Sequence, residues 1–344
     1  MLFEELKNRN IPELKPREEM LTIIQNEEYG KLIPPPEKVT FTVAEELVER
    51  FCASKATLHK VIAECVINGK EFSFPFYAAV PTQKKKYPFF VHVNFRDDNP
   101  DRYQPTEEII DNGFAVLTVC YTDVTSDDDD FTNGLAGVLF PDGKRKDNDS
   151  GKIAMWAWAA SRVLDYAEQN EEWFDLEKCI VCGHSRLGKT VLLAAAFDER
   201  FKFSYSNDSG CSGAALARGT TGETVDDICR RFPFWFCENY KKYANNEDSM
   251  PFDQHYLVAT IAPRHVLIGS AKEDAWADPK SEQLCCVAAS PAFKNAFDCE
   301  DRFAKACDEF FKGDIGYHLR NGTHYFSRED WQKLIKFVRE KIES

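Results

Sequence analysis

Residues 183–190, GHSRLGKT, hold the residue types of two different chemistries. The apolar segment KCIVC precedes them and the helix-forming segment VLLAAAF follows, which predicts a tight turn between a strand and a helix. In a serine hydrolase, such a turn projects a nucleophile, here Ser185, above the sheet. In a nucleotide-binding protein, the pattern G-x-x-x-x-G-K-S/T wraps backbone N–H groups around phosphates, with Lys189 on the phosphate oxygens and Thr190 on Mg²⁺.

The octapeptide matches the phosphate-binding pattern letter for letter and the hydrolase motif only in part. The common hydrolase form G-x-S-x-G has glycine two residues after the serine, whereas Leu187 stands there and Gly188 comes one residue later. A phosphate-binding loop usually follows the first strand of its sheet, and this segment lies past the middle of the chain with little glycine inside it. The octapeptide alone leaves both chemistries open, and a purely structural turn as well.

Residues further along the chain favour the hydrolase. A serine nucleophile needs a histidine base and an acid that orients it, and α/β-hydrolases carry them in the order serine, acid, histidine. The strand-like segment HVLIGSA is followed by KEDAWADP, which contains Glu273, Asp274 and Asp278. The strand-like segment DIGYHLR is followed by NGTHYFS, which contains His324. This order of strands and polar residues favours a serine hydrolase over a nucleotide-binding protein.

Strand-like and helix-like segments alternate through most of the chain and would position these residues. Segments 61–69 and 71–80 flank a short glycine-containing turn and predict an antiparallel hairpin. Apolar strand segments then alternate with helical ones, such as 151–170 and 185–200, which is typical of a mostly parallel sheet with helices on both faces. We therefore expect an α/β-hydrolase fold, a three-layer αβα sandwich with an N-terminal antiparallel hairpin.

Composition limits the class of protein. Lys and Arg number 43 and Asp and Glu 57 in 344 residues, so the net charge of −14 argues against binding to nucleic acid or to an anionic membrane. The acidic run TSDDDD, residues 125–130, lacks the Gly and Glu of a calcium loop, and we expect a solvated loop without a metal. Polar, proline-bearing residues 1–55 predict an arm packed on one catalytic domain of residues 56–344.

The N-terminus and the cysteines predict a compartment. The first residues, MLFEELKNRN, are charged and show no apolar leader. The 12 cysteines have neither disulfide-scaffold nor zinc-finger spacing. We therefore expect reduced thiols and a cytoplasmic protein.

Many segments together resemble the glucuronoyl esterases, a carbohydrate esterase family whose bacterial members are often labelled acetylxylan esterase. The similarity runs from about Pro88 onward and includes VCYTDV with DDDDFTNG, IAMWAWAASRVLDY, GHSRLGKT, SNDSGCSGAAL, GETV, FPFWFCENY, MPFDQHYLVATIAPRHV, EDAWADP and GTHYFSREDW. The core G-x-S-R-x-G-K is specific, because ordinary esterases lack arginine after the nucleophile.

The resemblance implies a role for each residue of the catalytic machinery. Ser185 matches the nucleophile, His324 the general base, and Arg186 the group that stabilises the oxyanion. The family places the acid at either of two positions, one after each of two strands. Asp274 and Asp208 stand at these positions, and we favour Asp274 because aspartate is the usual acid at its strand end.

The resemblance also implies a substrate. Lys189, one helical turn from Ser185, matches a ligand of uronate hydroxyls, and Glu223 and Trp276 match positions that hold the sugar ring. The expected activity is hydrolysis of (4-O-methyl)glucuronic acid esters in a small xylan-derived saccharide, with no cofactor or metal and no nucleic-acid or membrane partner. The alternatives are an acetylxylan or acetyl-sugar esterase, a nucleotide hydrolase using residues 183–190, and a carbohydrate-binding protein without activity.

Overall fold

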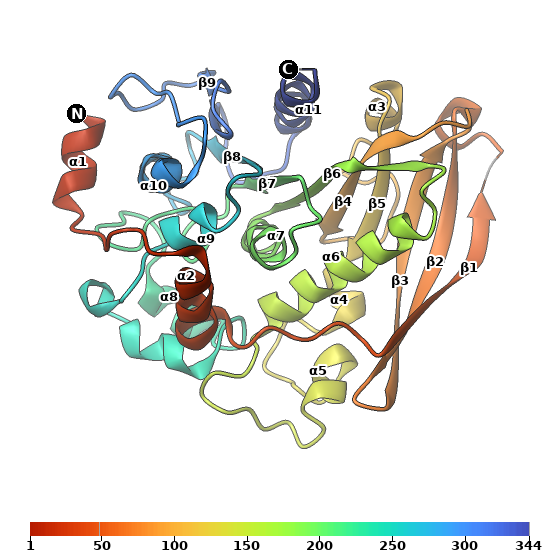
Figure 1. The fold of residues 1–344 in the computed structure, drawn as a ribbon, viewed down its shortest axis with the longest axis horizontal. Coiled ribbons are helices and arrows are strands. Elements are labelled where there is room, and N and C mark those ends of the chain that lie inside the picture. Colours follow the sequence, from red (N-terminus) through yellow and green to blue (C-terminus); the bar gives the residue numbers. More distant parts are fainter. Residues whose placement is uncertain (48, 344) are drawn as a thin grey trace.

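A ten-stranded sheet is the centre of the protein in a computed structural model, which describes residues 1–47 and 49–343 (Figure 1). In chain order its strands are β1 (Lys38–Leu47), β2 (Ala56–Ile67), β3 (Lys70–Pro81), β4 (Tyr87–Asn94), β5 (Ala115–Cys120), β6 (Phe174–His184), β7 (Phe203–Asn207), β8 (His265–Ala271), β9 (Glu309–Phe310) and β10 (Ile315–Arg320). Across the sheet their order is β1-β2-β3-β5-β4-β6-β7-β8-β10-β9. Strands β5, β4, β6, β7, β8 and β10 run parallel, whereas β1, β2 and β3 pair antiparallel and β9 closes the far edge antiparallel.

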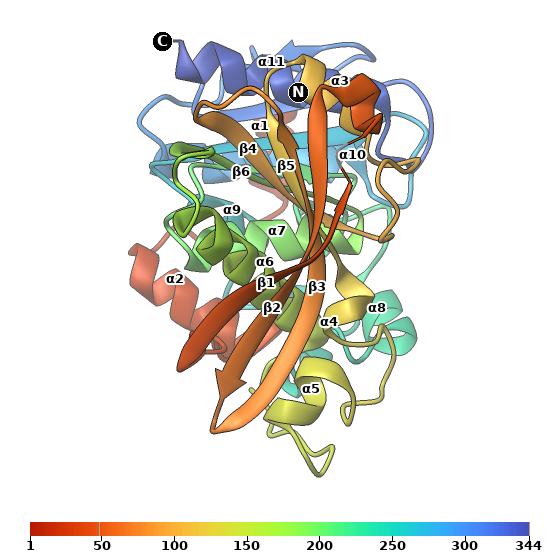
Figure 2. The same cartoon turned by 90° about the vertical axis from the view of Figure 1, so that its right-hand side faces the viewer.

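The predicted hairpin is confirmed as β2 and β3, which pair antiparallel from Ala56 and Pro81 down to Ile67 and Lys70. Asn68 and Gly69 form its two-residue turn, both with positive φ, which is the backbone that Asn-Gly adopts most readily in a tight hairpin. With β1 the hairpin forms a long, twisted antiparallel wing at one side of the molecule (Figure 2).

Helices cover both faces of the sheet, as the alternation of segments predicts. They are α1 (Leu2–Asn8), α2 (Arg17–Ile24), α3 (Thr106–Asp111), α4 (Tyr121–Val124), α5 (Gly134–Leu139), α6 (Lys152–Glu168), α7 (Arg186–Phe197), α8 (Val225–Arg231), α9 (His255–Ala259), α10 (Pro279–Ala289) and α11 (Arg328–Ile342), with short π or 3₁₀ turns η1 (Gln25–Tyr29), η2 (Phe51–Ser54), η3 (Glu238–Tyr243), η4 (Glu247–Ser249) and η5 (Ser290–Ala292). The α/β-hydrolase fold is therefore confirmed.

Alternation of side chains along the strands divides the core in two. Phe89 and Val91 of β4 belong to the apolar cluster formed with α6, α7 and α10, whereas Phe90 between them belongs to the cluster under α3 and α11. The ring of Phe90 lies 5.2 Å from that of Trp331 in α11. Both faces of the parallel strands are thus buried, which explains their continuous apolar sequences.

The N-terminal segment crosses the helical layer before it enters the sheet (Figure 1). The Arg9 guanidinium donates to the carbonyl of Arg218 at 2.7 Å, and the indole of Trp158 in α6 donates to the carbonyl of Pro34 at 2.9 Å. Sequence analysis missed β1, which lies inside predicted arm 1–55, because its mostly exposed side chains give no apolar strand pattern. The division at residue 55 stays a prediction. Among the described helices, none combines the length and apolarity required to span a bilayer.

Candidate active site

Ser185 occupies a strained turn between β6 and α7. Its φ of 59° and ψ of −128° lie where non-glycine residues are rarely found, as in the nucleophile turn of hydrolases. A Cβ on Gly183 would lie 2.5 Å from the carbonyl oxygen of Leu187, so glycine is required there. The second close approach falls on Gly188, where a Cβ would lie 2.9 Å from the Ser206 hydroxyl. Leu187 is therefore tolerated where the common motif has glycine, because the crowded position is one residue later.

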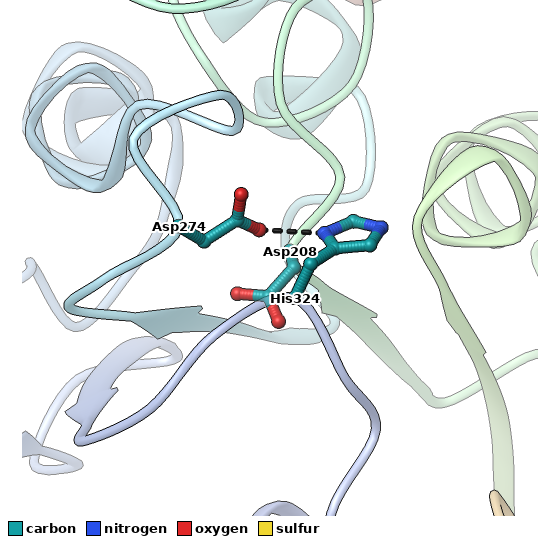
Figure 3. A group of neighbouring side chains, drawn as sticks. All are labelled: Asp208, Asp274 and His324. Carbon is teal, nitrogen blue, oxygen red and sulfur yellow. Dashed lines mark hydrogen bonds and ion pairs between the residues drawn. The ribbon is translucent and has the colours of Figure 1, made fainter.

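His324 and Asp274 meet at the carboxyl ends of neighbouring strands (Figure 3). His324 lies in the loop after β10 and Asp274 in the loop after β8, and their Nδ1 and Oδ2 atoms are 2.6 Å apart. A carboxylate can only accept, so Nδ1 donates and Nε2 is left free to take a proton. The Asp274 side chain is 4% exposed and that of His324 is 42% exposed. The acid is thus buried behind a histidine that faces the substrate side.

Asp208 lies near the same histidine but has different partners (Figure 3). The polar atoms of Asp208, Asp274 and His324 lie within 4.8 Å of one another. The carboxylate of Asp208 accepts from the Ala271 backbone N–H at 2.7 Å and from the Arg320 guanidinium at 3.1 Å. Both acids considered from the sequence therefore converge on one histidine, and only Asp274 has a hydrogen bond to its ring among the contacts of the described residues.

Arg320 ties Asp208 to the loop that carries His324. Its guanidinium also donates to Asp330 at 2.7 Å and to the carbonyls of Asn321 at 3.0 Å and Thr323 at 3.1 Å. Its side chain is buried, so these contacts replace the water that a guanidinium otherwise requires. The arrangement makes Asp208 part of a buried ion network under the histidine loop.

Arg186, directly after Ser185, is held by an acid that sequence analysis assigned to a solvated loop. The Arg186 guanidinium pairs with Asp127, which also accepts from the indole of Trp235 at 2.7 Å and the hydroxyl of Tyr121 at 2.9 Å. The guanidinium lies 4.7 Å from the centroid of the Trp235 ring. For Asp127 the prediction of a solvated loop is wrong, since its side chain is 12% exposed. Its position after β5, at the same sheet edge as Ser185, is the signal that could have identified it.

Lys189, Glu223 and Trp276 form a second linked group. Lys189 is buried and donates to the carbonyls of Ser209 and Cys211, and its Nζ lies 3.5 Å from the Glu223 carboxylate. The other oxygen of Glu223 accepts from the Trp276 indole at 3.2 Å. The Trp276 side chain is 43% exposed, so it offers an aromatic surface to solvent. Lys189 uses its three N–H groups within the protein, and the weakest of the three contacts is that to Glu223.

A cavity of about 170 Å³ brings most of these residues together. Eight residues were singled out from the sequence, and the eighth, Asp274, lies behind His324. The other seven line the cavity: Ser185, Arg186, Lys189, Asp208, Glu223, Trp276 and His324. Six further residues line the cavity that sequence analysis did not select, among them Arg231, Phe232 and Trp235. The guanidinium of Arg231, at the end of α8, lies 4.8 Å from the Trp276 ring centroid. Phe232 and Trp235 belong to FPFWFCENY, one of the segments that resemble the family, and this resemblance is the signal that could have identified them, whereas no motif marks Arg231.

The octapeptide does not have the geometry of a phosphate-binding loop. Lys189 is buried among protein acceptors, and the Thr190 hydroxyl donates to the carbonyl of Arg186 at 3.0 Å. Neither group is available to a nucleotide or its magnesium ion in this arrangement.

A serine on a strand-to-helix turn of a mostly parallel sheet, followed in the chain by an acid and a histidine that meet beside it, defines a protein of the α/β-hydrolase class. A family model described as "Glucuronyl esterase, fungi" matches residues 63–296. The chain belongs to the glucuronoyl esterase family, as the resemblance in its motifs implies.

Individual relatives agree with this family. Over 236 residues the chain is 40% identical to carbohydrate esterase MZ0003 from an unknown prokaryotic organism, covering 67% of this chain and 54% of the relative. It is 26% identical over 289 residues to 4-O-methyl-glucuronoyl methylesterase 1 of Phanerochaete chrysosporium, covering 80% and 57%. The solved structure of a glucuronoyl esterase from Solibacter usitatus has a TM-score of 0.86 at 30% identity, over 94% of this chain and 92% of that one. The chain spans little more than half the length of these two curated relatives.

Proposed function

We propose that the protein is a serine carboxylester hydrolase that cleaves esters of (4-O-methyl)glucuronic acid in xylan-derived saccharides. The observation that carries this proposal is the hydrogen-bonded pair of Asp274 and His324 in front of a cavity that also contains Ser185 and Arg186. The names of the curated relatives, among them a 4-O-methyl-glucuronoyl methylesterase, support the same substrate class.

The reaction follows the two steps of acyl transfer. His324 Nε2 accepts the hydroxyl proton of Ser185 while Oγ attacks the ester carbonyl. The tetrahedral intermediate collapses, the C–O bond to the alcohol breaks, and His324 returns the proton to the leaving oxygen. Water then attacks the acyl-enzyme while His324 again accepts a proton. The bond between the acyl carbon and Ser185 Oγ breaks, His324 returns the proton to Oγ, and the uronic acid leaves. Asp274 fixes the histidine tautomer and stabilises the imidazolium formed in each step.

Arg186 stabilises the negative charge that develops on the carbonyl oxygen. Asp127 and the face of Trp235 hold its guanidinium in place before substrate arrives, so little reorganisation is required during the reaction. The nearby Glu223 carboxylate and Trp276 indole offer an acceptor and an aromatic face, which suit a sugar with several hydroxyl groups.

Replacing Arg186 by glutamine is expected to lower kcat by about 10²–10³-fold, the loss typical of an oxyanion donor. KM should change little, because the interaction strengthens only in the transition state. Steady-state hydrolysis of the benzyl ester of glucuronic acid measures both constants. The control is Arg230→Gln, which removes an exposed arginine of α8 and should leave kcat unchanged. A higher KM with an unchanged kcat would show that Arg186 binds substrate without acting on the oxyanion.

The substrate class is tested by comparing two esters. Wild-type protein should hydrolyse the benzyl ester of glucuronic acid faster than acetylated xylan, and a fluorophosphonate probe should label wild type but not Ser185→Ala. Deacetylation of xylan without hydrolysis of the glucuronate ester would assign the protein to the acetyl esterases. Absence of labelling together with sugar binding would identify a non-catalytic carbohydrate-binding protein.

We further propose that the protein works in the cytoplasm. All 12 cysteines are free thiols in the structure and nine of them are buried, which suits a reducing compartment. Antibody detection in fractionated source cells tests this, and recovery in the medium or the cell envelope would contradict it.

A further inference from the structure

A second cavity, of about 440 Å³, shares a wall with the candidate active site. The loop after β8 forms this wall: Ala275 and Asp278 line the second cavity, whereas Trp276 and Ala277 line the first. Thr221, two residues before Glu223, also lines the second cavity. A ligand that fills the active site can therefore extend over this loop into the neighbouring space.

The second cavity is cationic in a protein that is acidic overall. Three exposed lysines line it, Lys272, Lys280 and Lys305. None of their ammonium groups forms an ion pair with a residue that the structure describes, although the chain carries 57 acidic residues. The one carboxylate in the lining, Asp278, is 3% exposed and accepts from the Ser281 hydroxyl at 2.6 Å and the Thr221 N–H at 2.8 Å. Its oxygens are thus bound to neutral donors, and the lysines remain available to an anion.

The rest of the lining suits a sugar more than a small inorganic ion. Half-buried Phe303 supplies aromatic surface, and the ammonium of Lys280 lies 5.6 Å from the Phe303 ring centroid. Its volume falls within the roughly 300–1,000 Å³ of ligand sites, whereas the 170 Å³ of the active-site cavity falls below it. The active site thus holds only the reacting unit of a saccharide, and the remainder must lie outside.

We propose that this cavity binds free carboxylates of an acidic saccharide whose esterified uronate unit occupies the active site. This inference rests on the proposed function and adds to it a substrate class: oligosaccharides with several uronate units, of which one is esterified. Lysine provides a compact point charge for a carboxylate, and three such contacts at an exposed site give an attraction that salt weakens.

Inhibition of ester hydrolysis tests the proposal. The substrate is the benzyl ester of glucuronic acid, and two kinds of inhibitor are compared. One is an unesterified xylo-oligosaccharide with glucuronate side chains, and the other is an uncharged xylo-oligosaccharide of equal length. For wild type, the Ki of the acidic oligosaccharides should be about tenfold lower than that of the uncharged ones. This ratio corresponds to the summed binding free energy expected of three exposed charge contacts. The variant Lys272→Gln/Lys280→Gln/Lys305→Gln should lose this preference and keep its kcat and KM for the benzyl ester.

A matched variant separates the cavity from bulk charge. Lys84→Gln/Lys85→Gln/Lys86→Gln removes the same charge from the loop between β3 and β4, outside both cavities, and should keep the preference. Equal loss in both variants, or equal Ki for both oligosaccharides in wild type, would overturn the proposal. If wild type does not hydrolyse the benzyl ester, the proposed function fails, and calorimetric titration with the same oligosaccharides then tests the cavity alone.

Discussion

Replacing Asp274 by asparagine is expected to lower kcat by about 10⁴-fold, the effect of the same change in other serine hydrolase triads. The amide keeps the shape of the carboxylate but cannot fix the Nδ1–H tautomer of His324 or balance the imidazolium charge. Folding should be little affected, because among the described residues the second carboxylate oxygen makes just one long contact, 3.3 Å from the Ala277 N–H. Steady-state hydrolysis of a glucuronate ester measures the loss, and thermal unfolding verifies the fold.

The control for this experiment is the same change at Asp208, the other acid near His324. Because Asp208 is bound to Arg320 and the Ala271 N–H, its replacement should lower kcat per folded molecule far less than that of Asp274. A loss of about 10⁴-fold at Asp208 with a small loss at Asp274 would assign the triad acid to Asp208.

Asp208→Asn should instead destabilise the protein, by about 1.5–3 kcal/mol in the free energy of unfolding. Asp330 still balances the buried Arg320 guanidinium in this variant, but the amide lacks the charge that strengthens the contacts of Asp208 with Arg320 and with the Ala271 N–H. Equilibrium unfolding in urea measures the change. Asp298→Asn removes an exposed ion pair with Lys312 and should cost less than about 1 kcal/mol. Equal stability of both variants would show that Asp208 is not needed to hold Arg320.

The sequence was sufficient for features that depend on neighbours along the chain. Two of these features are local patterns: the strand, turn and helix around Ser185, and the hairpin at Asn68-Gly69. The order serine, acid, histidine combines several such patterns along the chain. Choosing between Asp208 and Asp274 was a different problem. Both follow parallel strands whose carboxyl ends meet at one edge, so both had to lie near His324, and only the hydrogen bond separates them.

Features that depend on distant residues escaped sequence reasoning. Asp127 and Arg186 are 59 residues apart, and an acidic run in a loop looks the same whether one member is buried or none is. Arg231 lines the cavity because α8 ends beside Trp276, a packing detail without a motif. Strand β1 was missed because edge strands need not alternate apolar and polar residues when both faces are exposed.

The pairing of Arg186 with Asp127 also bears on turnover. Lys189 is likewise paired with Glu223. Both cations beside the reacting carbonyl therefore already have a carboxylate partner, which suits a neutral ester but leaves little surplus attraction for the carboxylate formed from it. Hydrolysis therefore turns a well-matched ligand into a poorly matched one at the point of reaction, so the chemical step itself promotes departure of the acid product.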